Sequence, residues 1–308
     1  MTDAHCHVAQ GESRHFLCSP RDETLPAGRD DVIFAGFHPW DFLPGGPRER
    51  GLSPADLDAL RAKLESGAAF GIGEIGLDRL KSREIPSAMR EGFRAQLALA
   101  ARLSRPVVLH GAKCWGEVVR ECRPFAGTLP PHLGTLPTQM ATKMGTLPPQ
   151  LGTVPNRKGT VSAFIFHGFS RSDGLLLEIF KMNGYISIGP AILNDHAVNY
   201  REMAKHIPID RLLVESDATA APLGTLPSET GTLPAQMGTL PLKTRTLPRV
   251  EDVLAKLAEI RGIDCRNLAI AIEENVNRFI EMGSVPIKDK GCVPVISGTV
   301  PDERECPR

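Results

Sequence analysis

The chain of 308 residues lacks several features that mark whole classes of protein. It has no net charge, with 36 Lys and Arg against 36 Asp and Glu, so no long-range field draws a polyanion to it. No apolar run is long enough to cross a membrane, and the opening Met-Thr-Asp-Ala-His contains no apolar signal core. We therefore expect a soluble, cytoplasmic protein with no membrane or obligate protein partner. It should hold any polyanionic substrate locally, through metal ions and a few cations.

Cysteine is present, but not in a pattern that cross-links a chain or binds metal. The seven cysteines are odd in number, and no Cys-x-x-Cys pair occurs. An odd set without paired spacing suits a reducing compartment better than a disulfide framework. The missing pair also argues against a cysteine zinc site.

Apolar runs alternate with stretches of helical periodicity, which is the pattern of repeated βα units around a parallel sheet. The runs predict strands near 2–7, 15–19, 32–37, 69–75, 106–110, 163–167, 184–188 and 211–216. The periodic stretches predict helices at 54–66, 86–103, 114–123, 172–182, 196–206, 249–261 and 264–281, the first with Ser53 as its N-cap. Eight strands in a chain of this length predict an α/β fold, a TIM-type (β/α)8 barrel in regular or distorted form.

Copies or near copies of Gly-Thr-Leu-Pro interrupt this pattern in two places. They begin at 127, 134, 145, 152 and 159, and again at 224, 231 and 238. The spacing of seven at most steps invites a coiled-coil interpretation, but a Pro in all but one of the repeats blocks a continuous helix. One Leu or Val per repeat also offsets little ordering entropy. We expect disordered low-complexity insertions at 127–160 and 223–248, rather than a folded solenoid, within a barrel domain of residues 1–282 followed by a low-complexity tail at 283–308.

The segment Asp3-Ala-His-Cys-His7 supplies a first pair of metal-type side chains. In a strand over 2–7, His5 and His7 point to the same face, so two imidazoles on a rigid element can grip one divalent ion. A His-x-His pair also arises by chance, and alone it does not establish a metal site. The pair indicates a metal site only because later strands also end in metal-type residues.

Three of these residues lie in apolar strands. Glu74 stands in Gly71-Ile-Gly-Glu-Ile-Gly-Leu-Asp78, where an unpaired carboxylate is costly to bury. A metal shared with the histidines would compensate its charge, and an ion pair with Arg79 is the alternative. His110 and His167 each end an apolar strand. A single His at the end of an apolar strand is usually a core residue, but two strands that both end in this way favour a metal site.

The strand that begins at Arg211 ends in Glu215-Ser-Asp217, with two carboxylates on one face. Asp217, at the mouth of the strand, is the better ligand, whereas Glu215 can pair with a cation lower in the barrel. His38 follows Gly36-Phe37 at another strand end. Two interpretations of His38 are equally consistent with this position: a contact with substrate or metal, and a structural role.

In a parallel barrel the C-terminal ends of all strands meet at one face, where active sites lie. Six candidate metal ligands from five strands fall at or near such ends: His5, His7, Glu74, His110, His167 and Asp217. Four nitrogens and two carboxylates suit two divalent ions such as Zn²⁺ or Mn²⁺, and suit Mg²⁺ less well.

Together these motifs resemble the TatD-type metal-dependent hydrolases, which are deoxyribonucleases and related phosphoesterases of the amidohydrolase-like superfamily. The resemblance is carried by His5-x-His7, Gly36-Phe-His-Pro39, Gly73-Glu-Ile-Gly-Leu-Asp78, His110, His167-Gly-Phe-Ser170, Leu212-Leu-Val-Glu-Ser-Asp217 and Glu274-Asn-Val-Asn-Arg-Phe279. It spans roughly 1–126, 160–222 and 249–281. One departure is Ser216, because the family's strand ending reads Glu-Thr-Asp.

The resemblance implies a binuclear centre. His5, His7 and Asp217 would hold one ion, and Glu74 would bridge to a second ion bound by His110 and His167. We expect phosphodiester hydrolysis of DNA, as single strands or at ends, by a hydroxide activated by two divalent ions (Zn²⁺, Mn²⁺ or Mg²⁺), with Glu74 and Asp217 as the catalytic residues. Asp217 is expected both to hold metal and to accept the proton of the attacking water.

Four residues near strand ends are candidates for substrate contacts: His38, Arg79, Lys113 and Arg171. Solvated surface charge is the alternative for each of the three cations. Hydrolysis of an amide, ester or aminoacyl bond is a rival function, favoured by the zero net charge and by the repeat that begins soon after Asp217. A catalytically impaired barrel that serves as a scaffold is a second rival, against which the presence of all six ligands argues.

Overall fold

The computed structural model describes residues 1–11, 13–18, 30–127, 159–170, 173–218 and 249–284. The predicted insertions and the predicted tail lie almost entirely outside the described residues. The chain on both sides of the first insertion can be placed. Val161 N donates to Phe125 O at 2.8 Å, so the chain leaves and returns at one point, before the strand that begins at Phe164. This point lies at the end of the barrel opposite the C-terminal strand ends.

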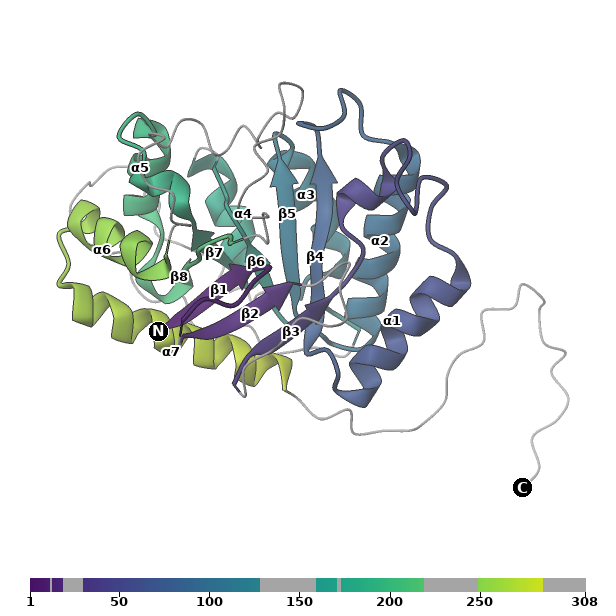
Figure 1. Ribbon diagram of the computed structural model, residues 1–308, viewed down its shortest axis with the longest axis horizontal. Helices are drawn as coiled ribbons and strands as arrows, with labels where there is room; N and C mark the ends of the chain where they lie inside the picture. Colours follow the sequence, from purple (N-terminus) through teal and green to yellow (C-terminus); the bar gives the residue numbers. More distant parts are fainter. Residues whose placement is uncertain (12, 19–29, 128–158, 171–172, 219–248, 285–308) are drawn as a thin grey trace, which may run out of the picture.

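Eight parallel strands form one sheet in the order of the sequence (Figure 1). They are β1 (Thr2–Cys6), β2 (Arg14–Cys18), β3 (Val32–Ala35), β4 (Gly71–Asp78), β5 (Val107–Ala112), β6 (Phe164–Phe166), β7 (Gly184–Ile188) and β8 (Leu212–Val214). All eight predicted strands are confirmed. β4 continues to Asp78, beyond its predicted end, and this extension carries part of the candidate site.

The residues after β8 bring the last strand against the first. Asp217 N donates to His5 O at 3.1 Å, and His7 N donates to Ala218 O at 2.8 Å. The buried Asp3 side chain accepts a further bond from Ser216 N at 2.9 Å. These bonds nearly close the sheet into a barrel, so the predicted fold class is confirmed.

Helices surround the sheet (Figure 1). They are α1 (Pro54–Ser66), α2 (Ser87–Arg102), α3 (Trp115–Cys122), α4 (Leu176–Lys181), α5 (Val198–His206), α6 (Val250–Arg261) and α7 (Cys265–Gly283). Ser53 caps α1 through a capping box with Asp56, as predicted. The described residues between β1 and β2 contain no helix, so the regular strand–helix alternation is interrupted at this connection. Among the described helices, none combines the length and apolarity needed to span a bilayer.

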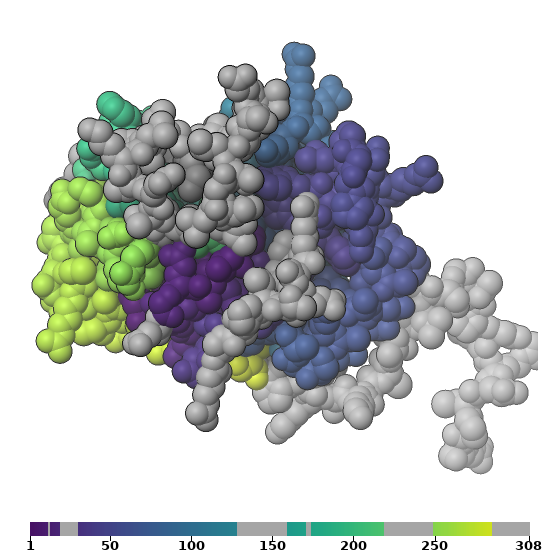
Figure 2. Space-filling view, in the orientation of Figure 1, coloured from purple at the N-terminus to yellow at the C-terminus, as the bar shows by residue number. Residues whose placement is uncertain are grey.

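The beginning and end of the described chain lie side by side, with the purple N-terminal segment against yellow-green α6 and α7 (Figure 2). Thr2 Oγ1 donates to Glu273 on α7 at 3.0 Å. Phe279 on the same helix packs against the rings of Phe16 and Tyr185, each with centroids 5.7 Å away. Helix α7 therefore covers the barrel away from the C-terminal strand ends, which carry the candidate ligands.

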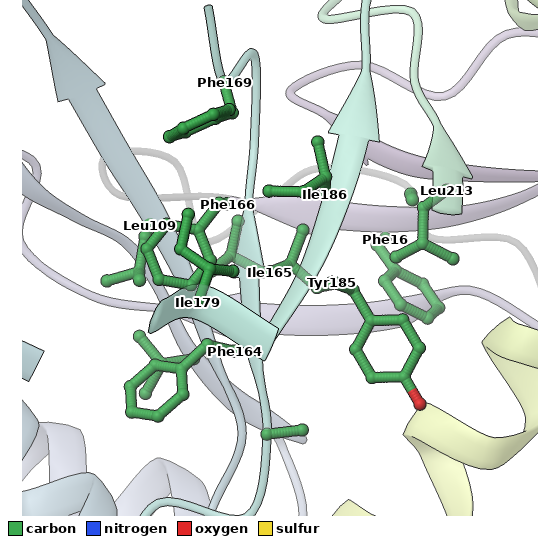
Figure 3. Packing of buried hydrophobic residues seen from close by; sticks show 14 of the residues in the cluster. Phe16, Leu109, Phe164, Ile165, Phe166, Phe169, Ile179, Tyr185, Ile186 and Leu213 are labelled. Carbon is green, nitrogen blue, oxygen red and sulfur yellow. The ribbon is translucent and has the colours of Figure 1, made fainter. Parts of the chain in front are cut away.

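The core between the sheet and the outer helices holds these strand ends in place. Phe164 and Phe166 alternate with Ile165 along β6, so the rings and Ile165 face opposite sides of the sheet (Figure 3). Trp115 on α3 packs against Phe166 and Phe169 with centroid distances of 5.8 and 5.3 Å. The same alternation turns the residue after Phe166, which is His167, toward the interior of the barrel.

Candidate metal centre

Glu74 lies at the centre of a buried cluster of imidazoles. Its Oε1 is 2.5 Å from His110 Nδ1 and 2.7 Å from His167 Nε2. Its Oε2 is 3.4 Å from His7 Nε2 and 3.5 Å from His5 Nε2. The two oxygens of one carboxylate therefore face two different pairs of histidines. This is the arrangement that a carboxylate bridging two cations requires.

Asp217 completes the half of the cluster that contains His5. Its Oδ1 lies 3.5 Å from His5 Nε2, and its side chain is 42% exposed, so it stands at the mouth of the site. The backbone of Asp217 adopts φ 50, in the left-handed region, and the bond from its N–H to His5 O holds that conformation. All six predicted ligands are thus brought together at the C-terminal ends of the strands.

The donor set fits divalent cations. The His5 side chain is fully buried, yet within the described residues neither of its ring nitrogens has a hydrogen-bond partner. Its Nε2 is 3.5 Å from oxygens of both Glu74 and Asp217. Two atoms bound to one tetrahedral ion at about 2.0–2.1 Å lie roughly 3.3 Å apart, so this spacing suits ligands of a shared cation better than a hydrogen bond.

Three groups of potential ligand atoms lie within 4.8 Å of one another: His5, His7 and Asp217; His5, Glu74 and His167; and His38, Glu74 and His110. The first group matches the set predicted for one ion. Glu74 belongs to the other two groups, which share its carboxylate. Neither of these two groups is the set predicted for the second ion, because His167 is grouped with His5 and His110 with His38. Candidate metal-binding groups are thus present at the strand ends, and their division between two ions stays a prediction.

The charges in the cluster compensate one another. Burial alone would raise the pKa of Glu74, but His167, His110, His38 and His5 lower it well below its usual range, so the carboxylate is ionised. Burial lowers the pKa of His110, but Glu74 and Asp78 outweigh it and raise the value to about 9. A divalent ion and the protons on these rings are therefore alternative ways to neutralise Glu74.

In three of the histidines, the ring nitrogen that does not face Glu74 contacts a second partner, and this contact orients the ring. Metal-binding histidines commonly donate their other ring N–H to a carboxylate or a backbone carbonyl, which fixes the tautomer and the ring orientation. The contacts are His7 Nδ1 with Cys18 O at 2.8 Å, His110 Nε2 with Asp78 Oδ2 at 3.2 Å and His167 Nδ1 with Glu215 Oε1 at 3.4 Å. This second layer of partners supports the interpretation of the cluster as a metal site.

A model of the TatD related DNase family matches residues 23–281. The chain belongs to this family. The predicted resemblance is confirmed, although His5 and His7 precede the matched residues.

Relatives of the TatD family differ in how much of this chain they match. The 3'-5' ssDNA/RNA exonuclease TatD of Edwardsiella piscicida is 29% identical over 185 residues, which are 60% of this chain and 56% of that protein. The match thus spans little more than half the length of that relative. The uncharacterized metal-dependent hydrolase YcfH of Escherichia coli K12 is 23% identical over 310 residues, covering 92% of this chain and 96% of its own length. The crystal structure of YjjV, a TatD homolog from the same organism, shares the fold, with a TM-score of 0.61 at 19% identity over 90% of this chain and 96% of its own.

In this TatD-family chain, two carboxylates take roles that the sequence pattern did not assign. Glu215 accepts a bond from Gly168 N at 2.8 Å and faces His167, so within the described residues it pairs with an imidazole of the site rather than with a cation lower in the barrel. Burial raises its pKa to about 7. Asp78 ends one of the motifs that carry the family resemblance, but no role was predicted for it. It shares the strand face of Glu74 at the C-terminal end of β4, and that spacing is the signal that could have placed it at the site.

Asp78 is fixed on four sides. Its Oδ2 accepts a bond from Trp40 Nε1 at 2.6 Å and faces His110, while its Oδ1 accepts from the backbone N–H groups of Leu80 and Lys81 at 2.6 and 2.9 Å. Burial raises the pKa of Asp78, but these partners outweigh it and lower the value to about 2. The carboxylate is therefore ionised and rigidly placed behind His110.

The predicted substrate contacts lie in different surroundings. His38 is buried, 3.7 Å from Glu74 through Nε2, while its Nδ1 accepts a bond from Trp40 N at 3.2 Å, so it faces the site and also caps a short 3-10 helix, Pro39–Phe42. Arg79 pairs with Glu117 on α3 at 2.6 Å, so the alternative ion pair between Glu74 and Arg79 is not formed. Lys113 is exposed just after β5. Arg171 lies outside the described residues.

We expect the substitution Asp3→Asn to change how stability depends on pH. Burial raises the pKa of Asp3 to about 6, above its usual 3.8. Folding therefore favours the protonated form, and the stability that this contributes is present below pH 3.8 and lost as the pH rises through 6. The stability of the variant relative to the wild type should rise by up to about 3 kcal/mol between pH 4 and pH 8.

Urea unfolding of chelator-treated protein across this pH range measures the effect. Asp58→Asn on α1 is the control, because that side chain is 65% exposed. A stability difference between the Asp3 variant and the wild type that does not change with pH would contradict the assignment.

Proposed function

We propose that this TatD-family chain is a divalent-metal-dependent hydrolase that cleaves phosphodiester bonds in DNA, acting on single strands or strand ends. The observation that carries the proposal is the buried Glu74, whose two oxygens face His110 and His167 on one side and His5 and His7 on the other. The relative named a 3'-5' ssDNA/RNA exonuclease supports this choice of bond.

His5, His7 and Asp217 would hold one ion, His110 and His167 would hold a second, and Glu74 would contribute a carboxylate oxygen to each. The four imidazoles favour Zn²⁺ or Mn²⁺ over Mg²⁺. When bound, such ions lower the pKa of water toward neutrality and neutralise charge that develops on the phosphoryl oxygens.

Asp217 is the proposed acceptor of the proton from the attacking water. Its side chain is 42% exposed at the mouth of the site, whereas Glu74 is buried. Desolvation raises the pKa of Asp217, but the neighbouring His5 and His167 rings lower it overall, so it is an ionised base at neutral pH. The fixed backbone at this position keeps the carboxylate beside His5 while one side remains open to substrate.

Hydrolysis of an amide, ester or aminoacyl bond is the second candidate. A two-ion site of this kind does not select phosphorus by itself, and the chain has no net charge to attract a polyanion. The clustering of all six candidate ligands supports an enzyme over an impaired scaffold. We also propose a cytoplasmic location, with which the free thiols of Cys6, Cys18, Cys114, Cys122 and Cys265 agree.

A substrate panel on metal-loaded protein tests the proposed bond. We expect a labelled single-stranded oligonucleotide to be shortened, while p-nitrophenyl esters and N-acyl amino acids are turned over slowly or not at all. Treatment with a chelator should abolish the activity, and Zn²⁺ or Mn²⁺ should restore it. Activity that persists after exhaustive metal removal, shown by elemental analysis, would refute metal dependence, and a preference for the amides or esters would favour the second candidate.

A further inference from the structure

Trp40 is a large aromatic side chain at the edge of the candidate metal centre. It is half-buried, whereas His38, Asp78 and His110 beside it are buried. Its ring lies 4.8 Å from the ring of His38 at 86°, and its Nε1–H donates to Asp78 Oδ2 at 2.6 Å. Since His38 faces Glu74 and Asp78 faces His110, the indole is held one side chain away from the proposed ions.

The indole of Trp40 does not serve the hydrophobic core. In its segment, Phe42 is buried in the core, and the half-buried Phe37 and Leu43 pack against it. Trp40 is not among the described residues that do so. A half-exposed aromatic ring that is rigidly held but does not pack the core is available for a ligand.

Lys81 places a cation on the same ring. Its Nζ lies 4.9 Å from the Trp40 ring, and its backbone N–H donates to Asp78, the carboxylate that also holds the indole. Its side chain is exposed, and no carboxylate in the described part of the chain pairs with its ammonium group. Arg79, two residues earlier, is by contrast engaged with Glu117.

We propose that Trp40 stacks on a base of the nucleic-acid strand next to the scissile bond, and that Lys81 contacts a phosphate of the same strand. An aromatic platform beside a cation is how proteins hold single strands without reading their sequence, because every base has a π face. The inference rests on the proposed function and narrows it. The substrate is a single strand, whose bases are free to stack, and cleavage should depend little on base identity.

Tryptophan fluorescence can follow the stacking directly. The chain has two tryptophans, and Trp115 is buried, with 1% of its surface exposed. Oligothymidylate with phosphorothioate linkages, added to metal-loaded protein, should therefore quench the emission of Trp40 in a saturable manner. Trp40→Phe should abolish the quenching. No quenching at concentrations at which the strand is bound, as measured by anisotropy of a labelled oligonucleotide, would overturn the stacking.

Two substitutions separate stacking from an effect through Asp78. Trp40→Phe keeps an aromatic face but loses the N–H that bonds Asp78, whereas Trp40→Ala loses both. We expect oligonucleotide affinity to fall about 5- to 150-fold in the Ala variant and to stay near that of the wild type in the Phe variant. Equal losses in the two variants, together with a loss of bound metal, would assign the residue to positioning of His110 instead.

The phosphate contact has a separate readout. Lys81→Gln should reduce the slope of log affinity against log salt by about one, and Lys63→Gln on α1 is the control for removing a lysine charge. An unchanged slope for the Lys81 variant would overturn its role.

Failure of this inference can be told apart from failure of the proposed function. If oligonucleotides are cleaved while Trp40→Ala binds them as tightly as the wild type, the stacking is wrong and the nuclease function stands. If no oligonucleotide is bound or cleaved but an ester or amide is hydrolysed, the proposed function fails and the inference fails with it.

Discussion

Glu74→Gln should reduce turnover of a single-stranded oligonucleotide by about 10³-fold or more, well beyond the 10- to 100-fold cost typical of losing an outer partner of a metal site. The amide keeps the volume of the side chain but has no charge, and its nitrogen cannot replace the second oxygen as a ligand. Both Glu74 oxygens face imidazoles within 3.5 Å, so a single substitution affects both proposed ions. Turnover number and metal content by elemental analysis measure the two effects, with fewer than two ions per chain expected.

Glu121→Gln is the matched control for this substitution. Glu121 is also largely buried, but its carboxylate pairs with Arg90 and Arg94 between α2 and α3, outside the cluster of imidazoles. The control should lose some stability and keep its metal and its activity. Far-UV circular dichroism checks that the Glu74 variant is folded. A folded Glu74→Gln protein with two bound ions and undiminished turnover would disprove the bridging role.

Gly76→Ala should destabilise the protein by about 3–5 kcal/mol, the sum of backbone strain and overpacking. Gly76 has φ 156, and a Cβ there would lie 2.0 Å from the backbone oxygen of His110. That oxygen cannot move aside cheaply, because Gly76 is paired with His110 in the ladder between β4 and β5. Urea unfolding measures the loss, and a chemical shift change at the His110 ring would report its displacement.

Two other glycines separate the causes of this loss. Gly67 has φ 79 but no atom within 4 Å of a Cβ, so Gly67→Ala should cost only about 1 kcal/mol of strain. Gly116 on α3 has neither a positive φ nor a nearby atom, so Gly116→Ala should be neutral or slightly stabilising. If Gly76→Ala proved as stable as Gly67→Ala, the close approach of β4 and β5 would be in doubt.

The sequence was sufficient to locate the strands and the six candidate ligands, because both depend on local pattern. In this context, apolar runs such as Phe164–Phe166 can be buried only as strands. Because side chains alternate between the two faces of a strand, the face to which the residue after each run points is then fixed. Once the barrel is accepted, the convergence of His5, Glu74 and Asp217 follows from topology, because parallel strands end on one face.

The partners of the charged side chains could not be found in this way, because they depend on how distant elements pack. Arg79 follows the end of β4 and looks free to meet a phosphate, yet α3 brings Glu117 to within 2.6 Å of it. Glu215 meets His167 because β8 and β6 approach across the barrel interior. These distances cannot be predicted from the sequence pattern.

The sequence by itself thus determined the class of fold, the chemistry of the ligands and the end of the barrel at which they lie, since alternation and apolarity act along the chain. Only the tertiary structure decided which nitrogen faces which oxygen, that Asp78 stands behind His110, and that Trp40 remains half-exposed beside them. These relations are set by the register between strands and by the packing of helices outside them, which join residues tens to hundreds of positions apart.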